Sequence, residues 1–136
     1  MSKLITMLFA LAAGAAGLAT AQQPAATATP MAPIKRILLQ RVDVPNSNFE
    51  TVTGIAEIAP SVNIGRHTHP GPETGYVMEG ELTLLVEGKP ALPLKVGDSY
   101  QIPNGAIHDA RSGDRGTKIF AVYDVEKGKP LASPSP

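Results

Sequence analysis

The chain is divided into short apolar runs by closely spaced turn residues, and this pattern limits its fold more than any other feature. The turn signals are Gly80, Gly88-Lys89-Pro90, Gly97-Asp98, Asn104-Gly105 and Gly113-Asp114. No window has the 3.6-residue periodicity of a long amphipathic helix. The runs between the turns predict short strands at 34–44, 51–59, 73–78, 81–86, 91–94, 99–102, 106–111 and 118–125. Strands at this spacing indicate an all-β sandwich or jelly-roll barrel; a mixed α+β domain is the alternative.

The N-terminus has the three parts of a secretory signal peptide. Lys3 supplies a positive start, residues 4–18 are uncharged and mostly apolar, and Ala19-Thr20-Ala21 is an A-x-A cleavage site. The apolar stretch is short for a membrane span, which needs about 20 residues. We therefore expect cleavage after Ala21, no membrane attachment afterwards, and a periplasmic or secreted protein. An uncleaved anchor or a buried N-terminal helix is the alternative.

The rest of the chain predicts one domain between two unstructured ends. Residues 22–33 are rich in Ala, Thr and Pro without periodicity, and residues 127–136 (KGKPLASPSP) have the same character. Such compositions favour disorder. The predicted division is a signal peptide over 1–21, a disordered lead-in over 22–33, a β-barrel domain over 34–126 and a disordered tail over 127–136.

Composition excludes several classes of function. The chain has no cysteine, so disulfides, thiol catalysis and cysteine metal sites are excluded. Twelve basic and twelve acidic residues give zero formal charge, which provides no electrostatic basis for binding nucleic acid. A small molecule is then the expected ligand. The three histidines are the residues best able to hold a transition metal.

All three histidines fall in a pattern that suits a metal site. His67 and His69 are two positions apart, so on a strand they point to the same face. Glu73 follows the turn Pro70-Gly71-Pro72, and His108 lies on a separate predicted strand. Three imidazoles and one carboxylate form a mixed site that suits Fe, Mn, Ni, Cu or Zn. The alternative is three unrelated histidines, in the core or exposed.

Two segments resemble the conserved motifs of the cupin family. The first cupin motif, HxH(x)3–4E(x)6G, is matched by His67-Thr68-His69, three residues, Glu73, six residues and Gly80. The second, G(x)5PxG(x)2H, is matched by Gly97, five residues, Pro103-Asn104-Gly105, two residues and His108. Sixteen residues separate the motifs, as in the short spacer of small bacterial single-domain cupins. Ser61 and Ser112 depart from the usual Gly and Asn at the motif ends.

The resemblance implies a cupin jelly-roll β-barrel, also called a double-stranded β-helix, with a metal inside. By analogy with the family, the metal ligands are His67, His69, Glu73 and His108. It also implies a homodimer, for which 34–44 is a candidate exchanged edge strand, because an open sheet edge invites pairing.

Four protein ligands leave one or two positions open on a five- or six-coordinate metal, as catalysis requires. Glu73 is a candidate base as well as a ligand, since no spare histidine remains. Small residues beside the ligands leave room for a ligand or simply fit a tight barrel. Weak candidates for the substrate pocket are Asn63, Gln101, Tyr76 and Phe120, although packing is the more usual role of the two aromatic residues.

Three functions remain open. The first is a metal-dependent enzyme of dioxygenase type, acting on a small molecule that binds the metal through two oxygens, such as a flavonol, catechol or β-diketone. The second is a non-catalytic module that binds a metal or small ligand. The third is an interaction domain without metal. Fold analogy does not decide between them.

Overall fold

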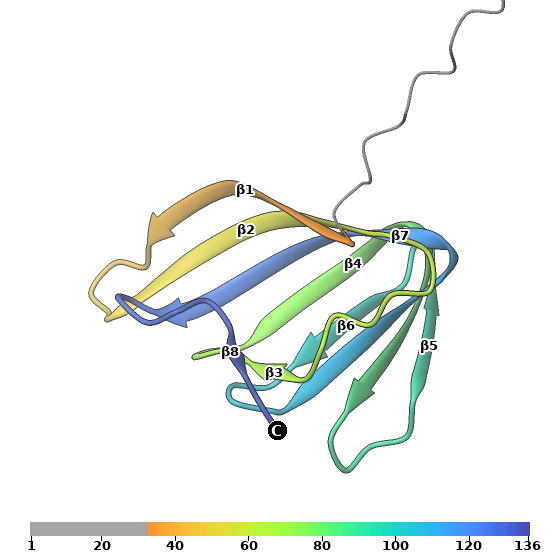
Figure 1. Cartoon of the computed structure of the whole chain (residues 1–136). Coiled ribbons are helices and arrows are strands. Elements are labelled where there is room, and N and C mark those ends of the chain that lie inside the picture. The colour runs from red at the N-terminus through yellow and green to blue at the C-terminus, as the bar shows by residue number, and fades with distance from the viewer. Residues whose placement is uncertain (1–32) are drawn as a thin grey trace, which may run out of the picture.

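The structure is a computed structural model that describes residues 33–136; the predicted signal peptide and most of the lead-in lie outside the described residues. Over the described part, the chain consists of strands and connecting loops with no helix, as the sequence predicts (Figure 1). Consequently no helix in residues 33–136 is long and apolar enough to cross a membrane. The eight strands are β1 (Ile34–Asp43), β2 (Phe49–Ile58), β3 (His67–Thr68), β4 (Glu73–Val86), β5 (Leu92–Lys95), β6 (Ser99–Ile102), β7 (His108–Glu126) and β8 (Ser133–Pro134).

The strands form one curled antiparallel sheet around the two longest, β4 and β7. The order β1-β2-β7-β3-β8 forms one path, and β4 pairs with β5, β6 and β7. Along β4 and β7 the register runs from Glu73 opposite Tyr123 to Val86 opposite His108. The histidine motifs are therefore distant in sequence but lie on neighbouring strands.

Each of the long strands β4 and β7 is continuous where the sequence predicts two separate strands. Gly80 does not end the first run: with φ near +74° it sits among two register shifts, so β4 bends and continues. A Cβ on Gly80 would lie 2.0 Å from the carbonyl oxygen of Gly116, so no larger residue fits there. The irregularity also changes which alternate positions face inward, from Val77 before the bend to Leu82 after it.

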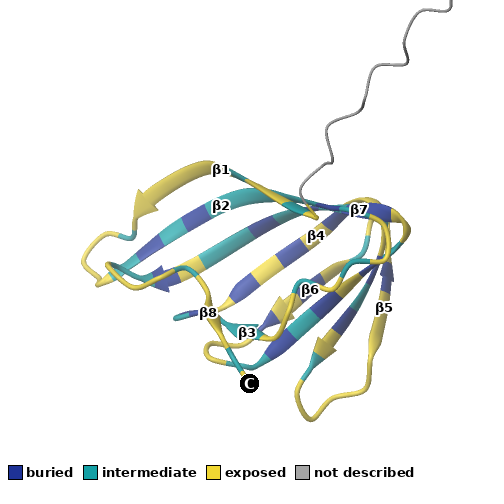
Figure 2. Ribbon diagram, viewed as in Figure 1, coloured by how far each residue is buried: buried dark blue, intermediate teal, exposed yellow. Residues whose placement is uncertain are grey.

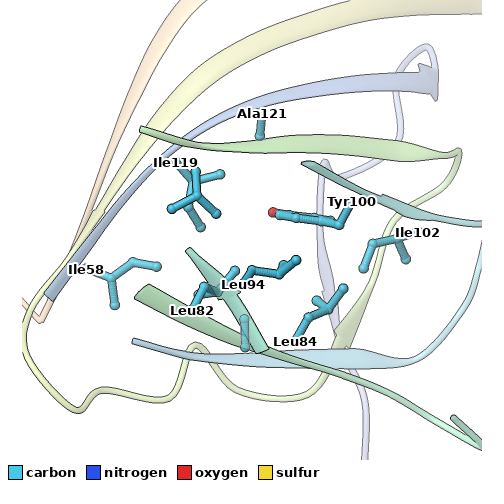
Figure 3. Close-up of a cluster of buried hydrophobic side chains, with 10 residues drawn as sticks. Ile58, Leu82, Leu84, Leu94, Tyr100, Ile102, Ile119 and Ala121 are labelled. Atoms are coloured by element: carbon cyan, nitrogen blue, oxygen red, sulfur yellow. The ribbon is translucent and has the colours of Figure 1, made fainter. Parts of the chain in front are cut away.

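The inner face of the curled sheet forms the hydrophobic core. Buried and exposed positions alternate along β4, β6 and β7 (Figure 2). The buried side chains point toward one another between the strands (Figure 3). The cluster contains Ile58, Val77, Leu82, Leu84, Leu94, Tyr100, Ile102, Ala110, Ile119 and Ala121. Removing this apolar surface from water is the main source of stability for such a sheet.

The C-terminal segment differs from the expected disordered tail. Its residues Ser133 and Pro134 form β8, which pairs antiparallel with β3, and the Ser135 amide donates to the Arg66 carbonyl at 3.0 Å. Composition did not indicate this pairing, because backbone groups rather than an apolar pattern make it. The tail thus lies beside the strand that carries the first histidine (Figure 1).

Strand β1 is an edge strand paired with β2 of the same chain. Its apolar side chains Leu38 and Val42 are 61% and 60% exposed. This surface is compatible with the expected homodimer, which stays a prediction.

Candidate metal centre

The backbone brings the three histidines and Glu73 to one end of the inner face. His67 on β3 is the direct pairing partner of His108, the first residue of β7. His69 follows β3, and Glu73 begins β4. The turn between them needs glycine at position 71, where a Cβ would lie 1.8 Å from the Asp124 carbonyl oxygen. The close approach of this turn to β7 explains the glycine between the second histidine and the glutamate.

The imidazole rings form a compact triad. Ring centroids are 4.9 Å apart for His67 and His69, 4.2 Å for His67 and His108, and 5.1 Å for His69 and His108. One nitrogen from each ring can be chosen so that all three lie within 4.8 Å of one another. His69 and His108 are buried and His67 is half-buried. The predicted grouping of these three histidines is therefore present in the structure.

A backbone carbonyl orients each ring. The Nδ1 atoms lie 2.7 Å from the Gly65 oxygen for His67, 2.6 Å from the Leu131 oxygen for His69, and 2.9 Å from the Ala106 oxygen for His108. Because a carbonyl can only accept, each Nδ1 carries a proton, so that each ring in its neutral form presents Nε2 as a lone pair. This is the usual outer arrangement of metal-binding histidines.

The Nε2 atoms of His69 and His108 are buried, and their polar neighbour within residues 33–136 is the Glu73 carboxylate, which cannot donate a hydrogen bond to an Nε2 lone pair. A buried polar atom without a partner is costly, and a metal ion would satisfy both. The donor set and its orientation thus fit a divalent transition metal, which agrees with the sequence-based expectation.

Glu73 completes the cluster as a carboxylate. Its Oε2 lies 3.0 Å from Nε2 of His69 and 3.4 Å from Nε2 of His108, and its Oε1 accepts a hydrogen bond from Tyr100 at 2.9 Å. Burial acts to raise the pKa of Glu73, but the contacts with His108, His69 and Tyr100 outweigh it and lower the pKa to about 2. Such a carboxylate is a better metal ligand than a general base.

The pKa values of the other titratable groups in the site are shifted in different directions. It lowers the pKa of His67, and the nearby His108 and His69 lower it further, which favours the neutral ring that a metal needs. Burial also acts to lower the pKa of His108, but the Glu73 carboxylate and the Ala106 carbonyl raise it overall. Burial and Glu73 raise the pKa values of Tyr100 and Tyr123, so both phenols keep their protons.

The cluster opens into a cavity of about 170 Å³. Apolar side chains from β2, β4 and β7 form most of its wall. Its polar lining outside the cluster comes from Arg36, Tyr100 and Tyr123, and the tail residues Leu131 and Ala132 line it as well. A larger hollow of about 410 Å³ lies at the bends of β4 and β7, but no histidine lines it.

The structure does not bring the four weaker pocket candidates to this cavity. Asn63 is exposed, and its amide lies 3.4 Å from the Asp109 carboxylate; it precedes β3, so strand alternation from His67 does not reach it. Tyr76 lies opposite Phe120 in the register of β4 and β7, on the outer face, because Glu73 and Gly75 occupy the inner positions. Gln101 is exposed beside the inward Tyr100.

Gly75 also has a role different from leaving space for a ligand. A Cβ at this position would lie 2.1 Å from the ring of Tyr100, so the glycine accommodates the tyrosine that contacts Glu73. Ala110, by contrast, does line the cavity.

Sequence reasoning missed Tyr123, Arg36 and Leu131 as neighbours of the site. Tyr123 lies opposite Glu73, and its ring centroid is 4.8 Å from that of His69. Alternation along 118–125 from an inward Ile119 could have identified it. Alternation from the half-buried Ile34 could have placed Arg36 on the inner face of β1. No sequence signal marked Leu131.

Comparison with known proteins identifies the family. Residues 54–125 match the Cupin domain family, which is more than half of the chain. The chain belongs to the cupin family. This membership and the all-strand curled sheet confirm the predicted cupin barrel.

Relatives of this cupin include an enzyme. The chain is 33% identical over 70 residues to dimethylsulfoniopropionate lyase DddQ of Ruegeria pomeroyi, covering 50% of this chain and 35% of the lyase. The chain thus spans about a third of that curated relative. The crystal structure of the same lyase is similar with a TM-score of 0.65 at 20% identity, covering 76% of this chain and 52% of that chain. A cupin-like protein from Thermotoga maritima has a TM-score of 0.61 at 24% identity, covering 75% of each chain. At these identities the structures establish the fold alone.

Proposed function

We propose that this cupin is a metal-dependent enzyme of dioxygenase type acting on a small molecule that binds through oxygen atoms. The observation that carries the proposal is the orientation of the imidazoles. Every Nδ1 is held by a carbonyl, and the buried Nε2 atoms of His69 and His108 converge on the Glu73 carboxylate, which cannot donate a hydrogen bond to them. The proposed ligands are His67, His69, His108 and Glu73, with Fe, Mn, Ni, Cu or Zn as the ion.

The residues around the cluster each have a defined task in this proposal. A bound metal with open positions supplies Lewis-acid polarisation and, for a redox metal, oxygen activation. Tyr100 holds Glu73 in place through its 2.9 Å hydrogen bond. The apolar walls exclude water and enclose the substrate. The cavity of about 170 Å³ favours a single-ring catechol or a short β-diketone over a flavonol, which would need the cavity to widen.

A lyase reaction is the second candidate. It is supported by the 33% identity to a relative named as a dimethylsulfoniopropionate lyase. The phenol of Tyr123, which lines the cavity beside His69, would take up a proton in such a reaction only if a bound metal lowered its raised pKa. The low pKa of Glu73 makes the carboxylate less suited to that task.

The test combines metal analysis with two activity assays. The purified chain is loaded with each of the five metals in turn, and its metal content is measured by mass spectrometry. Oxygen consumption is followed with catechols and β-diketones, and acrylate release is followed with dimethylsulfoniopropionate. Asn63→Ala is the control for His67→Ala and His108→Ala, because Asn63 is exposed and outside the cavity.

The outcomes separate the functions. Oxygen uptake that the histidine variants lose and Asn63→Ala keeps supports the dioxygenase. Acrylate release with the same dependence supports the lyase and excludes the first proposal. Stoichiometric metal with neither activity favours a non-catalytic binding module. Absence of metal binding under all loadings contradicts the whole proposal.

A further inference from the structure

One positively charged side chain lines the metal-binding cavity. Arg36 lies on β1, directly opposite Ala56 of β2, and both residues line the cavity. Ile34, two positions earlier, packs against the core, so strand alternation places Arg36 on the same inner face. The residue is exposed overall, which puts its side chain at the open end of the cavity.

The positive charge of Arg36 has no partner within residues 33–136. The arginines Arg41 and Arg66 form ion pairs with Glu50 and Glu87, but Arg36 forms neither an ion pair nor a side-chain hydrogen bond there. Arg36 lines the same cavity as Tyr123 and the histidine cluster. An unpaired guanidinium at the mouth of a cavity is suited to binding an anion.

The charges inside the cavity also favour an anionic ligand. Within residues 33–136, Glu73 is the one carboxylate that lines the cavity, and Tyr100 and the histidines already contact both of its oxygens. With three neutral histidines, a divalent ion and one carboxylate give a net charge of about +1, and Arg36 raises it to about +2. The carboxylate of a substrate would reduce this excess.

The wall between the two charged regions is apolar. In the register of β2 and β7, the row of Arg36 continues through Ala56 to Ile119, whereas Glu73 lies opposite Tyr123. Four residues along a strand span about 13 Å. The inner face of β7 between these rows carries Ala121. A ligand that reaches both regions therefore has a polar group at each end and an apolar middle.

We infer that Arg36 binds the carboxylate of a short organic acid whose other end, an oxygen donor, faces the histidine cluster. This inference rests on the proposed function, since it takes the histidine cluster as the metal end of the site. It narrows the substrate class from oxygen-chelating molecules in general to small hydroxy or keto acids with an apolar spacer. Arginine suits this role because its planar guanidinium can donate two parallel hydrogen bonds to a carboxylate.

The test compares an acid with its uncharged analogue on the metal-loaded full chain. The probes are 4-hydroxybutyrate and 4-hydroxybutyramide, with inorganic phosphate as a second anion, and binding is measured by isothermal titration calorimetry. The variants are Arg36→Gln and Arg36→Lys. Lys35→Gln is the matched control, because it removes a charge from the same strand on the opposite face, where Lys35 pairs with Glu57.

We expect the wild type and Lys35→Gln to bind the acid about tenfold or more tightly than the amide. Arg36→Gln should strongly reduce this preference, leaving only the part due to the bound metal, while metal content and melting temperature stay unchanged, and Arg36→Lys should restore it only in part. An acid preference that Arg36→Gln leaves intact would overturn the assignment. Phosphate binding more tightly than the acid would overturn the carboxylate class.

The metal measurement separates this inference from the proposed function. If the wild type binds no metal but prefers the acid, and Arg36→Gln lacks this preference, the proposed function fails and the Arg36 assignment stands. If the metal binds stoichiometrically and the acid preference does not depend on Arg36, the Arg36 assignment fails and the proposed metal site stands.

Discussion

Removing the C-terminal segment should weaken metal binding, although none of its residues belongs to the proposed ligand set. The Leu131 carbonyl accepts the hydrogen bond that orients His69, at 2.6 Å from Nδ1. Because this acceptor is a backbone atom, a side-chain substitution does not remove it, whereas a chain ending at Pro130 does. That truncation also removes β8 from the edge of β3 and the wall formed by Leu131 and Ala132.

The magnitude follows from the loss of one outer hydrogen bond to a ligand. Loss of such a partner lowers metal affinity by about 10- to 100-fold, which corresponds to about 1.4–2.8 kcal/mol. The estimate agrees with the cost of about 1–3 kcal/mol for leaving a buried donor unsatisfied, which applies here because His69 is only 6% exposed.

The assay is a competition titration against a chromophoric chelator at fixed pH. A second truncation that ends at Pro134 serves as the control, since it keeps Leu131 and β8 and loses only the contacts of Ser135 and Pro136 with Arg66. We expect the control to bind metal like the full chain. Equal affinity in the two truncations, at equal melting temperature, would refute the idea that the tail carbonyl supports the site.

Three further predictions follow from the site and the sheet edge. First, a metal at one hundred times its dissociation constant stabilises the fold by about 2.7 kcal/mol, so a chelator should lower the melting temperature of the full chain by about 10–20 °C. His108→Ala should remove this response, and an unchanged melting temperature in the full chain would contradict metal binding. Second, the folded-state pKa of Glu73 is about 2 against an ordinary 4.5, so its contribution to the stability of the metal-free chain is present above pH 4.5 and is lost as the pH falls toward 2. Tyr100→Phe removes the hydrogen-bond donor to Glu73, so it should destabilise the chain by about 1–3 kcal/mol at neutral pH. It should also move the midpoint of acid unfolding, measured by circular dichroism, to higher pH. An unchanged midpoint would show that the phenol does not stabilise the carboxylate. Third, light scattering should give a dimer at micromolar concentration, and Val42→Lys, on the exposed face of β1, should give a monomer; a monomeric full chain would refute the dimer.

Sequence reasoning predicted from two short motifs that the three histidines lie together, and the structure groups them; which residues bind a metal stays a prediction. The two-residue spacing of His67 and His69, the glycine-containing turn to Glu73, and the turn before His108 each determine an orientation within a few residues. The orientation of His69 is the exception, because it depends on the Leu131 carbonyl, which is distant in sequence. The strand positions were also predictable from local signals, apart from the joins at Gly80 and Gly116, where glycine bends a strand instead of ending it.

The walls of the cavity depend on pairings between distant segments, which a single sequence does not specify. Tyr76 and Tyr123 illustrate the difference: both are tyrosines on strands of the site, but the register of β4 and β7 places Tyr76 opposite Phe120 on the outer face and Tyr123 opposite Glu73 on the inner face. One irregularity such as the bend at Gly80 changes the inward set of every position beyond it. The prediction of which residues face inward therefore becomes less accurate with distance from the motif.

The same distinction suggests how such a chain could change its substrate and keep its metal. The three Nδ1 atoms are held by backbone carbonyls of Gly65, Ala106 and Leu131, so side-chain substitution elsewhere in the barrel leaves the histidine orientations in place. The opposite end of the cavity is formed by side chains such as Arg36 and Ile119, which can be exchanged singly. In the proposed site, metal binding and ligand choice thus depend on different kinds of groups. A variant at position 36 should consequently alter which acid binds without altering how the histidines are held.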